Sequence, residues 1–593
     1  MSSKAVHPTP NPGNSTPALV NEPQITTRSD DTLRIGLLLD SLRQPRWVRK
    51  IVEDISSSAF SRIVLLVKNV AKEPSVNALR RASRRRDRLL YGLYTKLDNR
   101  FSSVDPDAFE LVDISDLCKN VPMIAVAPMM TRFSDALADE DLAKFNEHKL
   151  DVVLRFGFRI LKGKVLDVAR YGVWSYHHDD SFLYRGGPPG FWEVMKDDPV
   201  TGSMLQILTE DLDNGKVLYR SWAPTISRFS VKQNNNNYYW KSAAFVGRQL
   251  KELHRDRTAF VANKPLDPIP RPYSGRLYVV PHNGEMFGLL VNLVRRASNR
   301  ILQKLTQSDT WSLAYRFRND DTDPNDSLHR YKYLLPPKGH FWADPFPVKV
   351  AGRYFVFFED FSHLARKGVI AMMELRKDGS TEAPVTVLER EFHLSYPFLF
   401  EWQSTLYMIP ETGSNNTVEL YRCNSFPLEW AKQTTLLEGN NPNDATLVQH
   451  DGRWWMFVNI QEPGVSANWD ETYLFHADTP LGPWAPHEHN PVKSDVRNSR
   501  PAGRLFYHRG HLMRPAQDSS VRYGYAIAIN RILKLTLEEY REEEVAKILP
   551  HWDRHVVGTH TFNTADELTM VDCLIQRHRF FQPSHVNRRD LSS

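Results

Sequence analysis

Cysteine is scarce in this sequence: three occur among 593 residues, at Cys118, Cys423 and Cys573. An odd number of cysteines at such distances gives neither a disulfide framework nor the paired spacing of a zinc site. We therefore expect a reducing compartment, with the cytoplasm as the default localisation, and we predict no metal site.

Long apolar runs are also missing. No window approaches the roughly 20 apolar residues that a membrane-spanning helix needs, so no such helix is expected. Residues 1–31 lack the apolar segment of a signal peptide and are predicted to form a disordered tail.

A strong excess of one charge is the third absence. Lys and Arg number 76 and Asp and Glu 70, which gives a net charge of only +6. This balance argues against a nucleic-acid partner. Residues 78–90, "ALRRASRRRDRLL", are locally basic, but no aromatic residues interleave the arginines. The run is therefore more typical of a solvated helix face than of a phosphate or nucleic-acid site.

The chain is long enough for two or three domains, and its 41% hydrophobic and 25% charged residues are typical of globular proteins. Short apolar runs at 33–41, 62–69, 123–128 and 150–158 predict strands, and 45–57 predicts a helix between the first two. Apolar strands with helical crossovers favour a parallel sheet, so we predict an α/β domain over 32–230.

Apolar residues at three- and four-residue spacing predict helices in a linker over 231–310. The segment 284–306 is apolar enough to lie on a membrane or a partner. Packing between the two flanking domains is the alternative that we favour.

An internal repeat occupies the region 311–585. Five segments align, "WADPFPV", "LSYPFLF", "PNDATLV", "NSRPAGR" and "GTHTFNT", and their equivalent positions are 52, 48, 56 and 60 residues apart. A period near 50 with several strands per unit is typical of propeller blades. We predict a multidomain fold class, in which a helical linker joins an α/β domain to an all-β five-bladed propeller whose ring is closed by 311–317.

In a parallel sheet, ligands bind beyond the carboxyl ends of the strands, and the polar stretch 173–194 is expected at that edge. His177 or His178 could transfer protons near neutral pH, and Asp213 could face them. An ordinary polar loop that closes in a tight turn at Arg185 is the alternative.

Three stretches, "VVLRFGFRIL", "GVWSYHHDDSFLYRGGPPGFWEV" and "TGSMLQILTEDLDNGKVLYR", resemble the formyltransferase fold family. The resemblance implies formyl transfer from 10-formyltetrahydrofolate to an amine. The family's Asn-x-His, Arg-Gly and Asp motif falls on His177, Arg185 and Asp213, but Ser175 stands where the family has Asn. That Asn donates to the developing oxyanion, and loss of such a donor typically costs about a hundred- to a thousandfold in rate. Ser175, His177 and Asp213 are the predicted catalytic residues, with His178 and Arg185 in substrate binding; a site that transfers another group, or nothing, stays open.

Equivalent positions in propeller blades converge on a central channel, where Asp344 and Asp444 would meet. Glycosidic chemistry needs two facing carboxyl groups, and a third raises the pKa of the proton donor. Asp344, Asp444 and Glu411 are therefore the predicted catalytic set. The predicted substrate-binding residues are Glu359, Tyr396, Arg500, Arg514, Gln517, Asp518 and His560. Purely structural pairing of these groups is the alternative, and His560 could be an ion ligand or a core histidine.

The motif "ADPFP" resembles the glycoside hydrolase families 43 and 32. More closely, "HFWADPFPV", "HLSYPFLFE", "YMIPETG" and "GTHTFN" resemble the N-terminal domain of plant glucosamine inositolphosphorylceramide transferases. Together the resemblances imply a carbohydrate-active enzyme that modifies or builds an amino-sugar-containing glycan or glycolipid. The alternatives are a non-catalytic sugar-binding or scaffold protein with degenerate sites, and an enzyme in which only the propeller hydrolyses or transfers glycosyl groups.

Overall fold

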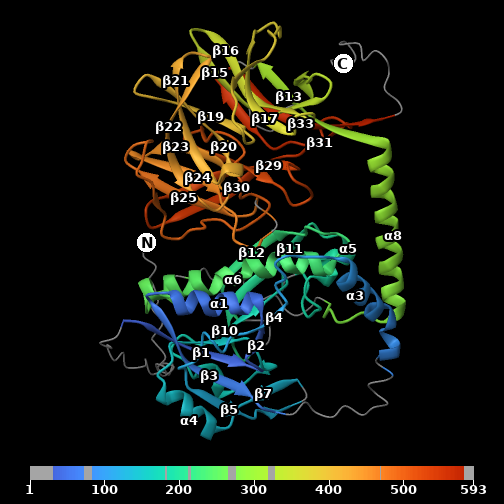
Figure 1. Ribbon diagram of the computed structural model, residues 1–593, viewed down its shortest axis with the longest axis vertical. Helices are drawn as coiled ribbons and strands as arrows, with labels where there is room; N and C mark the ends of the chain where they lie inside the picture. The colour runs from blue at the N-terminus through green and yellow to red at the C-terminus, as the bar shows by residue number, and fades with distance from the viewer. Residues whose placement is uncertain are drawn as a thin grey trace, which may run out of the picture.

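The computed structural model consists of an α/β region and a β region joined at one side by a long helix (Figure 1). It describes residues 31–71, 83, 85–131, 133–180, 183–211, 215–262, 264, 276–317, 328–465, 467 and 469–579. The multidomain combination of a parallel sheet with antiparallel sheets is confirmed.

The α/β region is built on a seven-stranded sheet with the strand order β12-β11-β10-β8-β1-β3-β5. Its strands are β1(Leu33–Leu39), β3(Ser61–Asn69), β5(Met123–Val126), β8(Val152–Arg155), β10(Val173–His177), β11(Val200–Ile207) and β12(Lys216–Pro224). β8, β1, β3 and β5 are parallel, as predicted. β10, where a loop was predicted, joins them in parallel, and β11 and β12 add an antiparallel edge. The α/β region also contains two small sheets. One pairs β2(Arg43–Pro45) with β4(Leu111–Asp113), and the other has the order β6(Met129–Met130), β7(Ser134–Ala136), β9(Ile160–Leu161).

Helices cover this sheet. They are α1(Arg46–Ser57), α3(Leu89–Phe101), α4(Asp139–Glu147), α5(Phe191–Lys196), α6(Val231–Asp256) and α7(Ala259–Ala262), with a 3-10 turn at Lys164–Asp167. α1 buries Ile51, Val52 and Ile55, whose spacing places them on one face. α6 packs on α1 and on β11 and β12 and buries Phe245 and Leu250. Although α6 lies in the range predicted as a linker, it is therefore part of the core of the α/β region.

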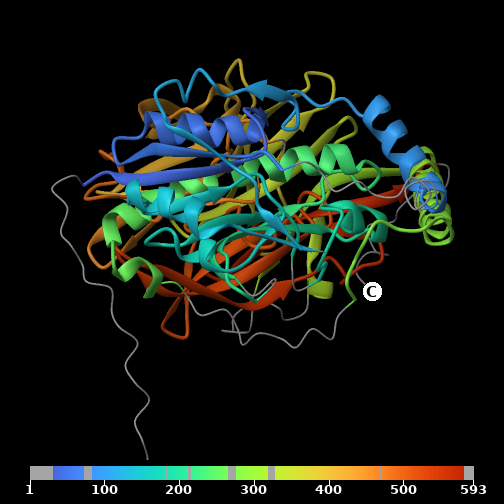
Figure 2. The same ribbon diagram turned by 90° about the horizontal axis from the view of Figure 1, so that it is seen from below.

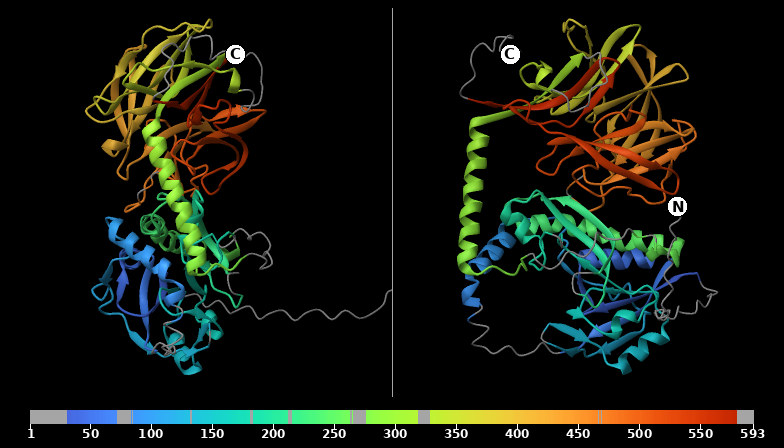
Figure 3. Two further views of the ribbon diagram at one scale, coloured as in Figure 1. Left: turned by 90° about the vertical axis from the view of Figure 1, so that its right-hand side faces the viewer. Right: turned by 180° about the vertical axis from the view of Figure 1, so that it is seen from behind.

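α8(Asn283–Thr306) runs along the side of the molecule from the α/β region to the β region (Figures 1 and 3). Viewed from below, α3 and α8 lie together at that side (Figure 2), and the two helices are in contact. The outer face of α8 leaves Phe287, Val294 and Leu305 about 60% exposed. In the described part of the chain, no helix is both long and apolar enough to cross a bilayer. For 284–306, packing between the two flanking domains is the favoured interpretation, and contact with a membrane or a partner stays an untested alternative.

The β region contains five consecutive antiparallel sheets. The first four are β15(His340–Val350) to β18(Val385–Leu388) through β16(Arg353–Ser362) and β17(Lys367–Leu375); β19(Ser395–Trp402), β20(Thr405–Thr412), β21(Thr417–Ser425) and β22(Glu429–Glu438); β23(Asn443–His450), β24(Arg453–Asn459), β25(Thr472–Ala477) and β26(Ala485–Pro486); and β27(Phe506–His508), β28(His511–Asp518), β29(Ala526–Leu535) and β30(Tyr540–Ile548). 3-10 turns occur at Leu328–Arg330 and Gly413–Asn415.

The fifth sheet joins the two ends of the β region. β31(Val556–Gly558), β32(Phe562–Ala565) and β33(Leu568–His578) are joined by β13(Gln307–Phe317) and β14(Lys332–Leu334). β13 pairs antiparallel with β33 over its whole length. The strand predicted at 311–317 thus joins the last strands of the β region in one sheet, and its closing of a propeller ring stays a prediction.

α6 fixes the α/β region against the β region. Lys241, 1% exposed, lies 2.8 Å from Asp470. Arg248 lies 2.8 Å from Glu471 and 2.6 Å from Glu462. Buried ion pairs hold a fixed geometry because separating the partners would leave a charge unpaired in a dry environment.

Candidate functional site

Three first strands of the β region carry the same backbone irregularity. Asp344, Tyr396 and Asp444 have φ of 51°, 42° and 54°, each at a register shift of its strand pair. A left-handed backbone is uncommon outside glycine and persists only where the surroundings enforce it. The repeat read from the sequence therefore has a structural counterpart in a bulge that turns one side chain out of the ladder.

The second strands place further acids beside these bulges. Glu359 lies opposite the residue before Asp344, and Glu411 lies opposite the residue before Tyr396. Asn459 occupies the equivalent position in the third sheet. We call the acids that gather here the acid cluster: Asp344, Glu359, Glu411, Asp444 and Asp572.

Arg500 is the cation of one half of the cluster. Its Nε donates to Asp444 Oδ2 at 2.5 Å, and its Nη2 donates to Glu411 Oε2 at 2.9 Å. Gln517 Nε2 also donates to Asp444 Oδ2, at 3.0 Å. Asp444 Oδ2 thus accepts two side-chain hydrogen bonds, one of them from a guanidinium group.

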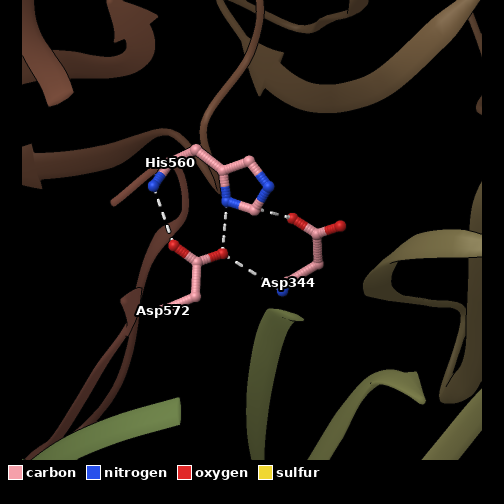
Figure 4. Close-up of side chains that lie close together, drawn as sticks. All are labelled: Asp344, His560 and Asp572. Carbon is pink, nitrogen blue, oxygen red and sulfur yellow. Dashed lines mark hydrogen bonds and ion pairs between the residues drawn. The ribbon is translucent and has the colours of Figure 1, made fainter. Parts of the chain in front are cut away.

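His560 is the cation of the other half (Figure 4). Its Nδ1 pairs with Asp572 Oδ2, while Asp572 Oδ1 accepts the backbone N–H of His560 at 2.7 Å. The Asp344 backbone N–H also donates to Asp572, at 3.2 Å. Burial alone would lower the pKa of His560, but the carboxylates of Asp572 and Asp344 raise it to about 9. His560 is therefore protonated at neutral pH.

The same three side chains are also candidate ligands for a metal ion. Asp344, His560 and Asp572 each offer a ligand atom, all within 4.8 Å of one another. A histidine must be neutral to bind a metal, and here the Nδ1 of His560 is already paired with Asp572. The three side chains satisfy one another, and the absence of a metal stays a prediction.

The acid cluster contains more carboxyl groups than Arg500 and His560 can neutralise. Burial, followed by the charges of the other acids, raises the pKa of Glu359 and Glu411 well above the ordinary value. Burial also raises the pKa of Asp344 to about 6, although His560 opposes this. Protonated acids and carboxylates therefore lie side by side, which is the combination that acid–base catalysis requires.

Three other predicted residues bond away from the cluster or across it. The Tyr396 hydroxyl bonds to Gly503 N and to Thr446 Oγ1. Arg514 pairs with Glu542, and Asp518 pairs with Lys547. These bonds link strands and sheets to one another.

The sequence patterns did not identify one member of the acid cluster, Asp572, or two residues beside the cluster, His393 and Trp311. Asp572 is a single charge in the apolar run "LTMVDCLI" (568–575), which is the signal that could have revealed it. His393 Nε2 lies 3.5 Å from Glu359, and the Trp311 ring stacks on His560 with centroids 4.2 Å apart. No spacing in the sequence marks the last two, because His393 lies in the connection between β18 and β19 and Trp311 lies in β13, both outside the repeated segments.

The α/β region has a cavity of about 650 Å³ beyond the ends of β8 and β10. Ser175 and His177 line it together, along with Gly186 and Gln206. Both lie in strand β10, whereas the sequence suggested a single loop over 173–194; the alternation of a strand is what turns both toward one face. Arg155, which was not predicted, donates from Nε to Ser175 Oγ at 3.0 Å.

The other α/β predictions are more dispersed. His178 points to the opposite face, where it stacks on Tyr239 at 3.7 Å and its Nε2 lies 3.1 Å from Ser242 Oγ. Burial lowers the pKa of His178 to about 3. The backbone carbonyl of Arg185 accepts from Tyr278 N at 2.8 Å. Asp213 lies outside the described residues.

Comparison with known proteins relates the β region to one family. Residues 336–568 match the model of "Glucosamine inositolphosphorylceramide transferase 1, N-terminal". Glucosamine inositolphosphorylceramide transferase 1 of Oryza sativa subsp. japonica is 38% identical over 210 residues, and that of Arabidopsis thaliana is 34% identical over 210. The alignments cover 35% of this chain, but only 28% and 27% of those relatives. The resemblance predicted from the sequence is confirmed.

Other similarities are shorter or more distant. Methionyl-tRNA formyltransferase of Prochlorococcus marinus (strain SARG) is 37% identical over 78 residues, which cover 13% of this chain and 23% of that protein. A thermostable family-43 glycoside hydrolase shares 14% identity at a TM-score of 0.28, covering 35% of this chain and 75% of its own. Glycinamide ribonucleotide transformylase 1 of Symbiobacterium toebii shares 13% identity at a TM-score of 0.26, covering 38% and 90%.

Proposed function

We propose that this protein, whose residues 336–568 match the N-terminal domain of a glucosamine inositolphosphorylceramide transferase, is an enzyme that modifies an amino-sugar-containing glycan or glycolipid. We assign the acid cluster as its main reaction centre. The observation that carries the proposal is that five carboxyl groups gather in one place, four of them paired with Arg500 or His560. The relatives are named as transferases of inositolphosphorylceramide, which supports a sugar-bearing lipid as the substrate class.

We further propose that the five antiparallel sheets are blades of one propeller around the acid cluster. Contacts between successive first strands, β15 with β19 and β19 with β23, support this arrangement. So do bonds between sheets, such as that from Thr561 Oγ1 to Asp344 Oδ1 at 2.5 Å. In a propeller, equivalent bulges meet at the central channel, which accounts for acids distant in sequence acting as one site.

The ionisation states suggest a role for each catalytic residue. Glu411, whose pKa is raised, is the general acid that protonates the leaving oxygen of a glycosidic bond. Asp344, with a pKa of about 6, is the base that accepts a proton from water or an acceptor hydroxyl. Asp444, which is positioned by its hydrogen bond from Arg500, stabilises the positive charge that develops on the sugar ring.

A panel of amino-sugar glycans and inositol-containing glycolipids tests the assignment. We expect Glu411→Gln to lower turnover by at least about a hundredfold, because a proton donor typically contributes that much. Asp518→Asn is the matched control, since Asp518 is a buried acid of the same region paired with Lys547 outside the cluster. Full activity in Glu411→Gln would exclude the acid role. Binding without turnover in the native chain would favour the alternative of a non-catalytic sugar-binding protein.

A second activity, formyl or related acyl transfer to an amine, is supported by the cavity beside Ser175 and His177 and by similarity to methionyl-tRNA formyltransferases. The cavity's volume and its mixed lining, with Phe133 and Leu161 beside Arg155, fit a flat and partly apolar ligand such as 10-formyltetrahydrofolate. That group, when bound, supplies the formyl carbon. His177 takes the proton of the amine, and Arg155 supplies the hydrogen-bond donor to the developing oxyanion that Asn supplies in the family.

Transfer of labelled formyl from 10-formyltetrahydrofolate to amino sugars tests this second activity. We expect Arg155→Ala and His177→Ala to abolish it. His178→Phe is the control, because His178 is buried on the opposite face. Formyl transfer that survives in both Arg155→Ala and His177→Ala would contradict the proposal, and so would the lack of any transfer by the native chain. The β region would then be left as the sole active part.

A further inference from the structure

A cavity of about 910 Å³ lies where α8, the α/β region and the β region meet. Its lining includes the last residue of β12 with the segment that follows it, one face of α8 from Arg296 to Lys304, the 519–523 loop and the end of β33. The cavity therefore belongs to neither region alone and exists only when both are in place.

The lining of this cavity is strongly basic. Its charged residues are the cations Arg228, Arg296, Arg300, Lys304, Arg522 and Arg579 and the acids Asp197 and Asp309, six against two. The difference is a local charge of +4, against +6 for all 593 residues. Such a concentration of one sign in a concave site favours an anionic ligand.

Part of this positive charge is not neutralised by the protein. Asp197 is shared by Arg228 and Arg296, at 3.4 and 2.8 Å, and Asp309 is taken by Arg522 at 2.9 Å. Arg300, Lys304 and Arg579 form no ion pair with an acid in the described part of the chain; Arg300 lies over the Phe229 ring, and Arg579 Nε donates to a backbone carbonyl. These three side chains can turn to a ligand without breaking an existing ion pair.

The cavity adjoins the acid cluster through Tyr523, which lines it. The Tyr523 ring lies 5.5 Å from the ring of His560 and 5.3 Å from the guanidinium of Arg500. A ligand anchored in the cavity by its anionic group would thus present its neighbouring part at the edge of the acid cluster.

We propose that this cavity binds the phosphoryl group of a phosphorylated sugar or polyol, and so orients the substrate of the acid cluster. Guanidinium groups match phosphate oxygens in geometry, and their attraction is stronger in a partly enclosed site than on an open surface. The inference rests on the proposed function and deepens it by naming the substrate's anchor. The phosphoryl group could be carried by a lipid or by a soluble compound, since both present the same oxygens.

Binding to the full chain tests the proposal, with inorganic phosphate, myo-inositol 1-phosphate and vesicles containing phosphatidylinositol as probes and myo-inositol as the neutral control. We expect Arg300→Glu/Lys304→Glu to weaken phosphate binding by about tenfold or more, the scale of a charged hydrogen bond or two. Arg295→Glu is the matched control, because Arg295 is an exposed cation of α8 outside the cavity lining. It should retain affinity within about twofold, the effect of a distant screened charge.

The probes separate the possible sources. Binding of the soluble phosphates that the double variant loses supports a free phosphorylated substrate, and binding only to vesicles, lost in the same variant, supports a lipid-borne one. No binding of any probe, or equal loss in Arg295→Glu, overturns the proposal. Glu411→Gln should bind phosphate like the native chain, so a failure of the catalytic assignment would leave a distinct result here.

Discussion

At the scale of single residues, buried charges in this protein are arranged in pairs whose protonation depends on their neighbours. The pair of Asp572 and His560 illustrates this, because Asp572 accepts three backbone N–H groups, those of Asp344, His560 and Thr561, as well as the imidazole. Such a carboxylate holds both the charge and the local backbone, so its effect on stability should depend on pH.

Asp572→Asn should destabilise the protein more at pH 6 than at pH 10. The pKa of His560 is raised from about 6.5 in the unfolded chain to about 9. The stability from this pair is therefore complete below about pH 6.5 and is lost as the pH rises through about 9. We expect a deficit of roughly 3 kcal/mol at pH 6, measured by urea unfolding. An equal deficit at both pH values would show that His560 is not charged in the folded protein.

Asp179 and Glu193 form a second buried pair. Here we expect a substitution to stabilise the protein, where Asp572→Asn destabilises it. Burial raises the pKa of both carboxyls, and each lies close to the other. Their folded pKa values exceed the unfolded ones, so the stability they contribute is present at acid pH and is lost as the pH rises from about 4 through about 8. Glu193→Gln should therefore stabilise the protein at pH 8, by about 1–2 kcal/mol, and not at pH 4.

Thermal unfolding at the two pH values checks this prediction. Glu389→Gln, at an exposed acid paired with Lys367, is the control and should shift neither curve appreciably. Destabilisation by Glu193→Gln at pH 8 would mean that Glu193 is ionised and that its charge is satisfied in the folded state.

At the scale of elements, the bulges of the first strands tie neighbouring sheets together. The Tyr396 hydroxyl accepts the backbone N–H of Gly503 at 2.7 Å and lies 2.9 Å from Thr446 Oγ1. One side chain of the second sheet thus bonds to the third sheet and to the segment that precedes the fourth.

Tyr396→Phe should cost about 1–3 kcal/mol of stability, because it leaves the buried N–H of Gly503 without its acceptor. The ring itself still fills its space against Phe346, so the fold should persist. Tyr507→Phe is the control, since Tyr507 is 62% exposed. Urea unfolding of the two variants measures the difference; equal stabilities would remove the Tyr396 hydroxyl from the inter-sheet contacts.

At the scale of the whole molecule, the α/β region and the β region are coupled by the ion pairs of α6. Arg248→Ala would leave Glu471, which is 2% exposed, without its main cation. Removing one partner of a buried pair typically costs about 3–5 kcal/mol. We expect the variant to unfold in two calorimetric transitions where the native chain unfolds in one.

Arg255→Ala is the matched control for this prediction, because Arg255 lies on the same helix and pairs with the exposed Glu488. It should unfold like the native chain, since exposed pairs contribute about 0–1 kcal/mol. A single transition in Arg248→Ala at the native temperature would show that the two regions are held together by other contacts.

Much of the fold could be predicted from the sequence, because local patterns determine it. Apolar runs identified β1, β3, β5 and β8, and the 50-residue repeat identified Asp344, Tyr396 and Asp444 as equivalent positions, at which the structure has bulges. These features depend on spacing along the chain, which the sequence contains directly. The cytoplasmic localisation, drawn from the three cysteines, stays a prediction.

The pairings within the candidate sites were decided only by the tertiary structure. The sequence placed His177 and His178 together, but strand alternation separates them onto opposite faces. It gave Arg500 and Glu411 as separate candidates, whereas their ion pair joins residues 89 positions apart. Asp572 and Arg155 gained their roles only from partners on other strands. Periodicity determines which side chains leave a strand on one face, but the charge a buried side chain carries depends on neighbours that only folding brings near.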